Sequence, residues 1–248
     1  MNIGLALYTV KDECEKDFKA TIKRVAKIGY KGLEFAGFYG MDARELKKLT
    51  KDLGIKAVNA HISLENMEKN FRENIEYSKA LGIESITIPW LSEEKRSDRD
   101  VYLRTCELII KLSDKCSKAG IQLCYHNHDF EFIKINGDYM LDILFKNSIN
   151  LKMELDTFWS SYAGINTVEY MKKNAAKLHY IHLKDMAKNT KPLFTEVGEG
   201  CLDIRSFIHT AKNLGIEWAF IEQDICKRNP FDSIKLSLKN VKKIGLME

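Results

Sequence analysis

The sequence predicts an α/β fold, and more narrowly a (β/α)₈ barrel (TIM barrel) that spans residues 1–248 as a single domain. Short β-type runs alternate with helical stretches along the whole chain. Glycines mark most junctions at which a helical stretch gives way to a strand. The length of 248 residues is also close to the roughly 250 residues typical of this barrel.

Eight runs rich in aliphatic and aromatic residues are predicted to be strands. They begin near Ile3, Lys31, Ile55, Glu84, Ile121, Asn150, His179 and Glu217. The gaps between them contain stretches with helical periodicity, for example at 20–29, 43–54, 70–82 and 104–120. Regular alternation of this kind is typical of parallel strands joined by helical crossovers.

Five glycines each end a helical stretch just before a strand, at Gly29, Gly54, Gly82, Gly120 and Gly215. Glycine adopts the left-handed conformation that closes a helix, so these are predicted to be C-terminal caps. Only three prolines occur and no Ser/Gly-rich linker divides the chain, so we expect no domain boundary.

The alternative fold is an open, doubly wound sheet. Such a sheet normally carries a glycine-rich phosphate loop directly after its first strand. Here Tyr8 is followed by TVKDECEKD, which contains no glycine. The barrel is therefore the preferred fold.

Composition excludes several function classes. Hydrophobic residues make up 45% and charged residues 30%, as in an ordinary globular protein. The net charge of +4 is small and scattered, so we expect no nucleic-acid partner, and no apolar run is long enough for a membrane partner. Six cysteines without a CxxC pair, and the lack of a signal peptide, favour a cytoplasmic protein with reduced thiols. A homo-oligomer is left open.

Polar side chains gather at the predicted strand ends, where this barrel places its functional groups. All but Trp90 are able to ligate a metal or transfer a proton. These ends carry Tyr8, Glu34, His61, Trp90, His126, Asp156, His182 with Lys184, and Glu222.

Alternation along the strands predicts which of these side chains point into the barrel. In residues 151–156 (LKMELD) the apolar positions would face the helices, which turns Asp156 inward. The same argument turns His182, Lys184 and Glu222 inward. Alone, Asp156 could simply cap a helix and Glu222 could pair with Lys184. Together they predict a divalent metal site, and oxygen and nitrogen ligands suit Mn²⁺, Mg²⁺, Co²⁺ or Zn²⁺.

A set of motifs then resembles the xylose isomerase-like (β/α)₈ superfamily, particularly its sugar phosphate isomerase/epimerase family. The matching segments cover nearly the whole chain: LALYTVKDE (5–13), GLEFAGFYG (32–40), YHNHDFEF (125–132), ELDTFW (154–159), YIHLKD (180–185), EVGEG (196–200) and IEQD (221–224). The set is specific, although each segment alone is weak.

The resemblance implies metal ligands after strands five to eight of the barrel. Asp156, His182 and Glu222 match the last three of these ligands directly. The first, usually Glu, is replaced, because this chain has His126-Asn127-His128 where many relatives have ENH. Either His126 takes that place or Glu131 reaches back from the following loop.

The function expected from the residues and the resemblance together is that of a metal-dependent sugar isomerase or epimerase of carbohydrate metabolism, which abstracts a proton beside a metal-bound carbonyl or hydroxyl. Glu222 is the expected proton-transfer group, Glu131 or His126 its partner, and Lys184 a group that stabilises an oxyanion. The sugar would be bound by Tyr8, Glu34, His61, Trp90, His128 and Trp159.

The alternative is a lyase or dehydratase acting on a keto-sugar or inositol derivative with the same metal site. The residue at 126 bears on this choice, because epimerisation through two opposed Glu residues is less secure with His126 in one of the positions. Gly198-Glu199-Gly200 places an acid between its glycines, which favours a substrate without phosphate. A DNA-repair nuclease and an inert sugar-binding protein are the remaining classes.

Overall fold

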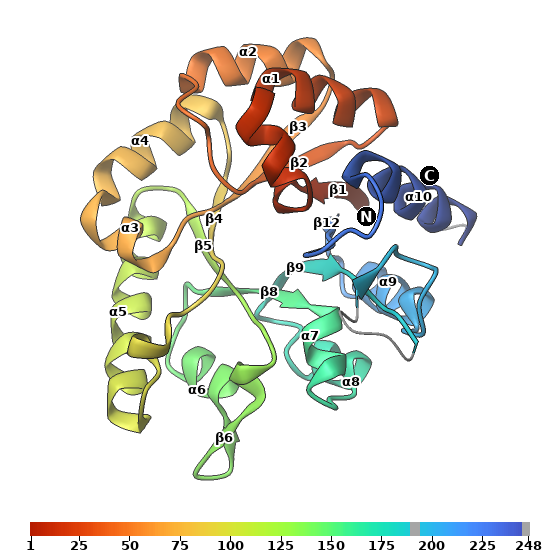
Figure 1. Cartoon of the computed structure of the whole chain (residues 1–248). Helices are drawn as coiled ribbons and strands as arrows, with labels where there is room; N and C mark the ends of the chain where they lie inside the picture. Colours follow the sequence, from red (N-terminus) through yellow and green to blue (C-terminus); the bar gives the residue numbers. More distant parts are fainter. Residues whose placement is uncertain (189–193, 245–248) are drawn as a thin grey trace.

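The computed structural model describes residues 1–188 and 194–244, and in it eight parallel strands close into a barrel (Figure 1). The order around the barrel is β1-β12-β9-β8-β5-β4-β3-β2. These strands are β1 (Asn2–Ala6), β2 (Gly32–Phe35), β3 (Lys56–His61), β4 (Ser85–Ile88), β5 (Gln122–His126), β8 (Lys152–Asp156), β9 (Leu178–Leu183) and β12 (Trp218–Ile221). The predicted fold and all eight predicted strands are confirmed.

Helices surround the barrel and connect its strands (Figure 1). They are α1 (Lys11–Ile28), α2 (Ala43–Asp52), α3 (Leu64–Lys69), α4 (Phe71–Leu81), α5 (Arg99–Lys118), α6 (Met140–Lys146), α7 (Thr157–Tyr162), α8 (Thr167–Lys173), α9 (Ile204–Asn213) and α10 (Pro230–Lys243). Among the described helices, none combines the length and apolar character that a bilayer-spanning segment requires.

Two small antiparallel strand pairs and three 3₁₀ turns complete the described structure. A hairpin joins β6 (Lys134–Ile135) to β7 (Asp138–Tyr139), and β10 (Asp185–Met186) pairs antiparallel with β11 (Phe194–Thr195). The turns are η1 (Leu7–Val10), η2 (Glu93–Lys95) and η3 (Phe130–Phe132). The sequence did not predict these strand pairs, because strands of two residues are too short to show alternation.

The predicted glycine caps are confirmed, since all five have positive φ, from +63° at Gly54 to +108° at Gly29. Each lies between the end of a helix and the start of the following strand. The helices therefore end where the sequence indicates, and the next strand begins shortly after each glycine.

Part of the barrel interior is filled by a cluster of mostly apolar side chains, which we call the apolar plug. It is separate from the hydrophobic core that lies between the strands and the helices. It consists of Ala6, Val58, Cys124, Tyr180, Trp218 and Phe220. The rings of Trp218 and Phe220 stack with centroids 6.4 Å apart, and Tyr180 packs edge-on against Phe220. Cys124, Tyr180, Trp218 and Phe220 are inward positions that the alternation predicts.

The plug fits because two strands have glycine where they face it, Gly4 on β1 and Gly32 on β2. A Cβ atom added to Gly32 would lie 2.8 Å from Val58 Cγ2 and 2.8 Å from Trp218 Cη2. Real Cβ contacts are longer, so the barrel holds these large rings only where a neighbouring strand has no side chain.

We expect Gly32→Ala to destabilise the fold by about 3 kcal/mol, because the new methyl group would overpack the plug. Gly54→Ala is the matched control: no atom lies within 4 Å of its added Cβ, so only the left-handed backbone should cost about 1 kcal/mol. Urea unfolding of both variants measures the difference. Equal losses would contradict the overpacking explanation.

Candidate functional site

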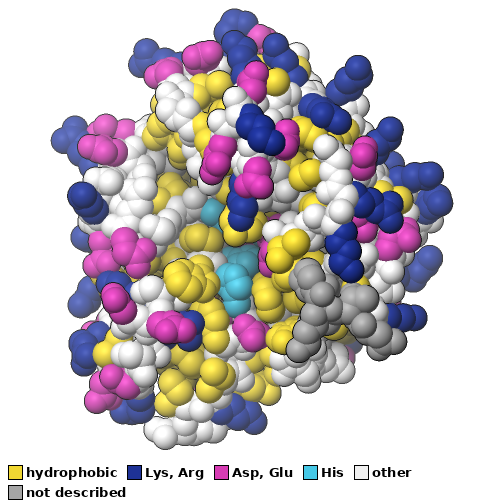
Figure 2. Space-filling model, viewed as in Figure 1, with side chains coloured by type: hydrophobic (Ala, Val, Ile, Leu, Met, Phe, Trp, Pro, Cys, Tyr) yellow, Lys and Arg dark blue, Asp and Glu magenta, His cyan; other side chains and the backbone are white. Residues whose placement is uncertain are grey.

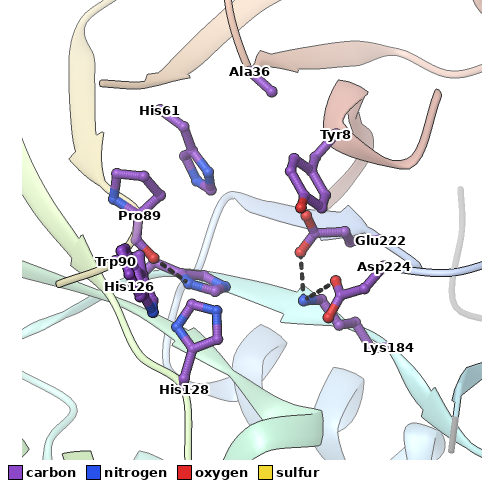
Figure 3. A pocket seen from close by; sticks show the side chains of 10 residues that line it. All are labelled: Tyr8, Ala36, His61, Pro89, Trp90, His126, His128, Lys184, Glu222 and Asp224. Atoms are coloured by element: carbon purple, nitrogen blue, oxygen red, sulfur yellow. Dashed lines mark hydrogen bonds and ion pairs between the residues drawn. The ribbon is translucent and has the colours of Figure 1, made fainter. Parts of the chain in front are cut away.

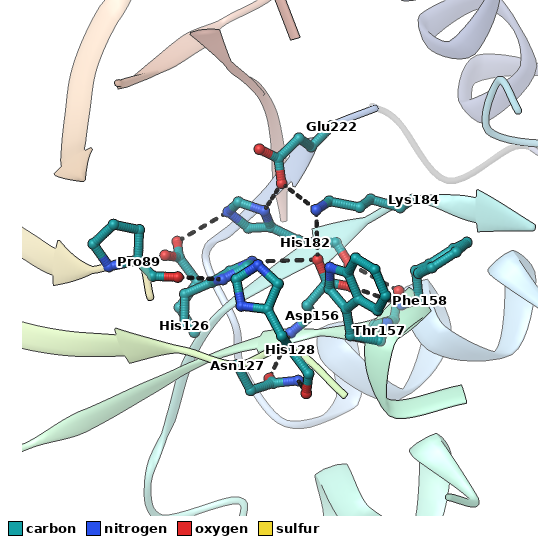
Figure 4. Close-up of polar contacts among 12 residues, drawn as sticks. Pro89, His126, Asn127, His128, Asp156, Thr157, Phe158, His182, Lys184 and Glu222 are labelled. Carbon is teal, nitrogen blue, oxygen red and sulfur yellow. Dashed lines mark hydrogen bonds and ion pairs between the residues drawn. The ribbon is translucent and has the colours of Figure 1, made fainter. Parts of the chain in front are cut away.

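Four buried side chains meet at the C-terminal ends of adjacent strands and form what we call the first cluster (Figure 4). It consists of His126 on β5, Asp156 on β8, His182 on β9 and Glu222 directly after β12. One ligand atom from each lies within 4.8 Å of the others. His126 Nε2 is 3.2 Å from Asp156 Oδ2, and His182 Nδ1 is 2.7 Å from Glu222 Oε2.

Asp156 uses its two oxygens for different purposes. Oδ1 accepts hydrogen bonds from the backbone N–H groups of Phe158 and Trp159, and so caps α7. Oδ2 faces His126 and the ammonium of Lys184. The sequence analysis treated helix capping and a place in the metal site as alternatives for Asp156. In the structure Asp156 caps α7 and also belongs to the first cluster.

Lys184 joins three carboxylates. Its Nζ atom lies 3.1 Å from Asp156 Oδ2, 2.8 Å from Glu222 Oε2 and 2.7 Å from Asp224 Oδ1. Burial opposes its charge, but the carboxylates outweigh burial and raise the pKa of Lys184 well above its usual value. Burial likewise opposes ionisation of Glu222, yet Lys184 and His182 hold its pKa well below the usual range.

The first cluster suits a divalent cation. Two carboxylates and two imidazoles are a ligand set that such ions accept, and the carboxylates match a charge of two. The ammonium of Lys184 also lies against Asp156 and Glu222, and it balances part of their negative charge.

A second cluster lies beside the first and shares His182 with it. Its members are Glu34 on β2, His61 on β3, Glu154 on β8 and His182. Here His182 presents Nε2, which is 2.9 Å from Glu34 Oε1 and 3.4 Å from Glu154 Oε1. Burial opposes a charge on His61, but Glu34 and Glu154 raise its pKa to about 10.

Glu131 lies outside both clusters. Its carboxylate accepts hydrogen bonds from Tyr125 Oη at 2.6 Å and from the backbone N–H of His128 at 2.7 Å. Tyr125 precedes His126 on β5, so the two side chains point to opposite faces of the sheet. Glu131 is fully buried, and in this position it fixes the loop that follows β5.

A cavity of about 460 Å³ opens beside the first cluster (Figure 3). Figure 2 shows histidines inside a hollow bordered by hydrophobic side chains. The lining residues are Tyr8, Ala36, His61, Pro89, Trp90, His126, His128, Lys184, Glu222 and Asp224. Burial lowers the pKa of His128 to about 2, so this imidazole is neutral.

Most of the sequence-predicted pocket residues line this cavity, but two do not. Glu34 is buried in the second cluster, and Trp159 packs against His128 with ring centroids 5.4 Å apart. Sequence reasoning did not name Glu154 and Asp224 as site residues. Alternation places Glu154 on the same face as Asp156, whereas Asp224 lies beyond the end of β12, where alternation does not apply.

The EVGEG segment has a structural explanation. The carboxylate of Asp185 accepts backbone N–H bonds from Met186, Gly198, Gly200 and Leu202 at 2.8–3.1 Å. A Cβ atom on Gly200 would lie 2.5 Å from the carbonyl oxygen of Met186. These amides therefore bind the chain's own carboxylate.

Comparison with known proteins gives consistent matches over most of the chain. A family model described as xylose isomerase-like TIM barrel matches residues 22–244. The inosose dehydratase of Clostridium perfringens is 23% identical, in an alignment that covers 92% of this chain and 90% of that protein.

Two solved structures show the same fold. A sugar phosphate isomerase/epimerase from Parabacteroides distasonis is 22% identical and covers 100% of this chain and 96% of its own, with a TM-score of 0.82. The IOLI protein, described with a binding zinc atom, is 16% identical and covers 100% of both chains, with a TM-score of 0.81.

We expect Glu131→Gln to remove a pH-dependent loss of stability. Burial raises the pKa of Glu131 to about 7 from 4.5, so the folded protein keeps a proton there that the unfolded chain releases. Stability should fall as pH rises from about 4.5 to 7, by about 3 kcal/mol, and the loss persists at higher pH.

Urea unfolding of both proteins at about pH 5 and about pH 8 measures this contribution. The free energy of unfolding of the variant, relative to that of the wild type, should be larger at about pH 8 than at about pH 5. The same pH dependence in both proteins would contradict a buried, proton-binding Glu131.

Proposed function

The chain belongs to the xylose isomerase-like TIM barrel family, and on that premise we propose that it is a metal-dependent lyase that eliminates water from a small polyhydroxylated ketone, such as a keto-inositol. The curated relative named inosose dehydratase supports elimination and matches 92% of the chain. The sugar phosphate isomerase/epimerase contributes likeness of fold at 22% identity. Isomerisation or epimerisation is the second candidate.

The observation that carries the proposal is the one-sided placement of carboxylates in the pocket. Among the described lining residues the carboxylates are Glu222 and Asp224, and both follow β12. At the end of β5, where an opposed Glu would serve epimerisation, the chain has His126. Carboxylates on one side suit removal and return of a proton on the same face.

His126, Asp156, His182 and Glu222 would hold the cation, which supplies Lewis acidity that polarises the ketone and acidifies the neighbouring C–H. In this assignment His126 takes the place left open by the resemblance, because Glu131 points away from the cluster. Glu222 is assigned to the cation and not to proton transfer, since its Oε2 contacts His182, another member of the first cluster.

Asp224 is the carboxylate assigned to proton removal. It lines the pocket, and Lys184 is its hydrogen-bond partner among the described residues. It takes the proton from the carbon beside the ketone; the bond to the hydroxyl on the next carbon then breaks as the C=C bond forms. The same carboxyl returns the proton to the departing hydroxyl, which leaves as water.

The pocket favours an uncharged substrate. Lys184 is the one Lys or Arg among the described residues that line it, and three carboxylates already surround it. His128 is neutral because its pKa is lowered by burial, and the amides of the EVGEG segment bind Asp185. No group is left to neutralise a phosphate in the described part of the pocket.

Product analysis tests the reaction type. Metal-loaded protein incubated with a keto-inositol in D₂O should give a product lighter by one water, because elimination removes a hydroxyl and a hydrogen. Mass spectrometry of the mixture measures it. A product that has lost no water but has gained deuterium on carbon would instead support isomerisation.

A matched pair of carboxylate-to-amide variants separates the two assigned roles. Asp156→Asn should lose the ion of the first cluster and all turnover. Asp224→Asn should keep that ion but lower kcat by about 100- to 10,000-fold, since proton transfer contributes that much. Metal analysis and initial rates measure both. Normal kcat in Asp224→Asn would exclude it as the base.

A further inference from the structure

We infer that the second cluster, formed by Glu34, His61, Glu154 and His182, is a second divalent-cation site next to the first. The inference comes from the geometry of these four side chains and does not depend on the reaction catalysed in the pocket. The two sites share one residue, His182, which presents Nδ1 to the first cluster and Nε2 to the second.

Four imidazole-to-carboxylate spacings in the cluster are close to those around a small tetrahedral ion, although the two to Glu154 involve different oxygens. His61 Nε2 lies 2.9 Å from Glu154 Oε2 and 3.1 Å from Glu34 Oε1. His182 Nε2 lies 2.9 Å from Glu34 Oε1 and 3.4 Å from Glu154 Oε1. Ligands at about 2.0–2.1 Å from a tetrahedral ion are roughly 3.3 Å apart, so a small expansion would admit one.

Two of these atoms are buried without a directed hydrogen bond. Glu34 Oε1 and His182 Nε2 are 2.9 Å apart, yet neither has a hydrogen-bond partner among the described residues. Glu34 is 1% exposed and His182 is not exposed. Buried polar atoms are normally paired, and atoms that converge off the hydrogen-bonding axis are arranged as ligands of a common ion.

Neighbouring side chains hold the carboxylate of Glu34 in this orientation. Asn59 Nδ2 donates to Glu34 Oε2 at 2.8 Å, which leaves Oε1 facing the cluster. The amide oxygen of Asn59 in turn accepts from Ser85 Oγ at 2.9 Å. Hydrogen bonds of this kind orient carboxylates that ligate metals.

Charge and access also suit a cation. The cluster contains two carboxylates, and Lys184 forms its ion pairs with Asp156, Glu222 and Asp224 instead. His61 lines the pocket, and its side chain is 8% exposed. An ion can therefore enter from the pocket past His61.

The shared imidazole makes the two sites interdependent. The two sites use opposite nitrogens of one ring. Two cations held by the same imidazole repel each other, so the second ion should bind in a separate, weaker step.

The test is a count of bound ions, independent of turnover. The whole chain, stripped with a chelator and titrated with Zn²⁺ or Co²⁺, should bind two ions in two steps by calorimetry and elemental analysis. Glu34→Gln and Asp156→Asn, matched carboxylate-to-amide changes in the two clusters, should each bind one, and the double variant none. Circular dichroism checks that each variant is folded.

One ion at saturation in the wild type, or two in folded Glu34→Gln, would overturn the inference; in the first case the cluster is an ion-paired network. His61→Gln, at the edge of the pocket, replaces Glu34→Gln if that variant does not fold. Anomalous diffraction from wild-type crystals with Co²⁺ should show an ion between Glu34 and Glu154. If the protein binds two ions but does not eliminate water from the keto-inositol, the result contradicts the proposed lyase activity and leaves the second cation site standing.

Discussion

The polar interior of this barrel depends on the imidazole of His182, which contacts carboxylates through both of its nitrogens. Nδ1 lies 2.7 Å from Glu222 and Nε2 lies 2.9 Å from Glu34, whose strands, β12 and β2, are separated by β1. The strand register fixes this position, since His182 is paired with Asp156 on β8 and with Phe220 on β12. Closure of the barrel therefore brings both clusters together at one residue.

Such a concentration of buried charge is unfavourable unless each group has a partner. Asp156, Glu222 and Asp224 surround Lys184, and Glu34 and Glu154 face the imidazoles. The apolar plug below supplies burial without charge. The barrel thus confines its electrostatic cost to the layer that opens on the pocket, which is typical of a functional site.

Much of this arrangement is predictable, because alternation with a period of two assigns each strand residue to a face. It places Asp156, His182, Lys184 and Glu222 inward correctly. Alternation does not show how deep in the barrel a side chain lies or which side chains it contacts. The convergence of Glu34 and Glu154 on His182 was therefore not predicted. Glu131 follows the end of β5 in the short turn η3, where no periodicity applies, and the turn directs its carboxylate to Tyr125.

The two clusters differ in what holds their carboxylates, and this difference sets the order in which cations would bind. Asp156 is fixed by backbone N–H groups at the start of α7, while Asn127 Oδ1 accepts the N–H of Asp156 itself. Glu34 is held by a side chain, the buried amide of Asn59, and not by backbone N–H groups. Groups held by backbone need less reorganisation on binding. The first cluster is therefore better preorganised to bind a cation than the second. Because both clusters include His182, an ion in the first cluster occupies Nδ1 and leaves only Nε2 of that imidazole for a second ion.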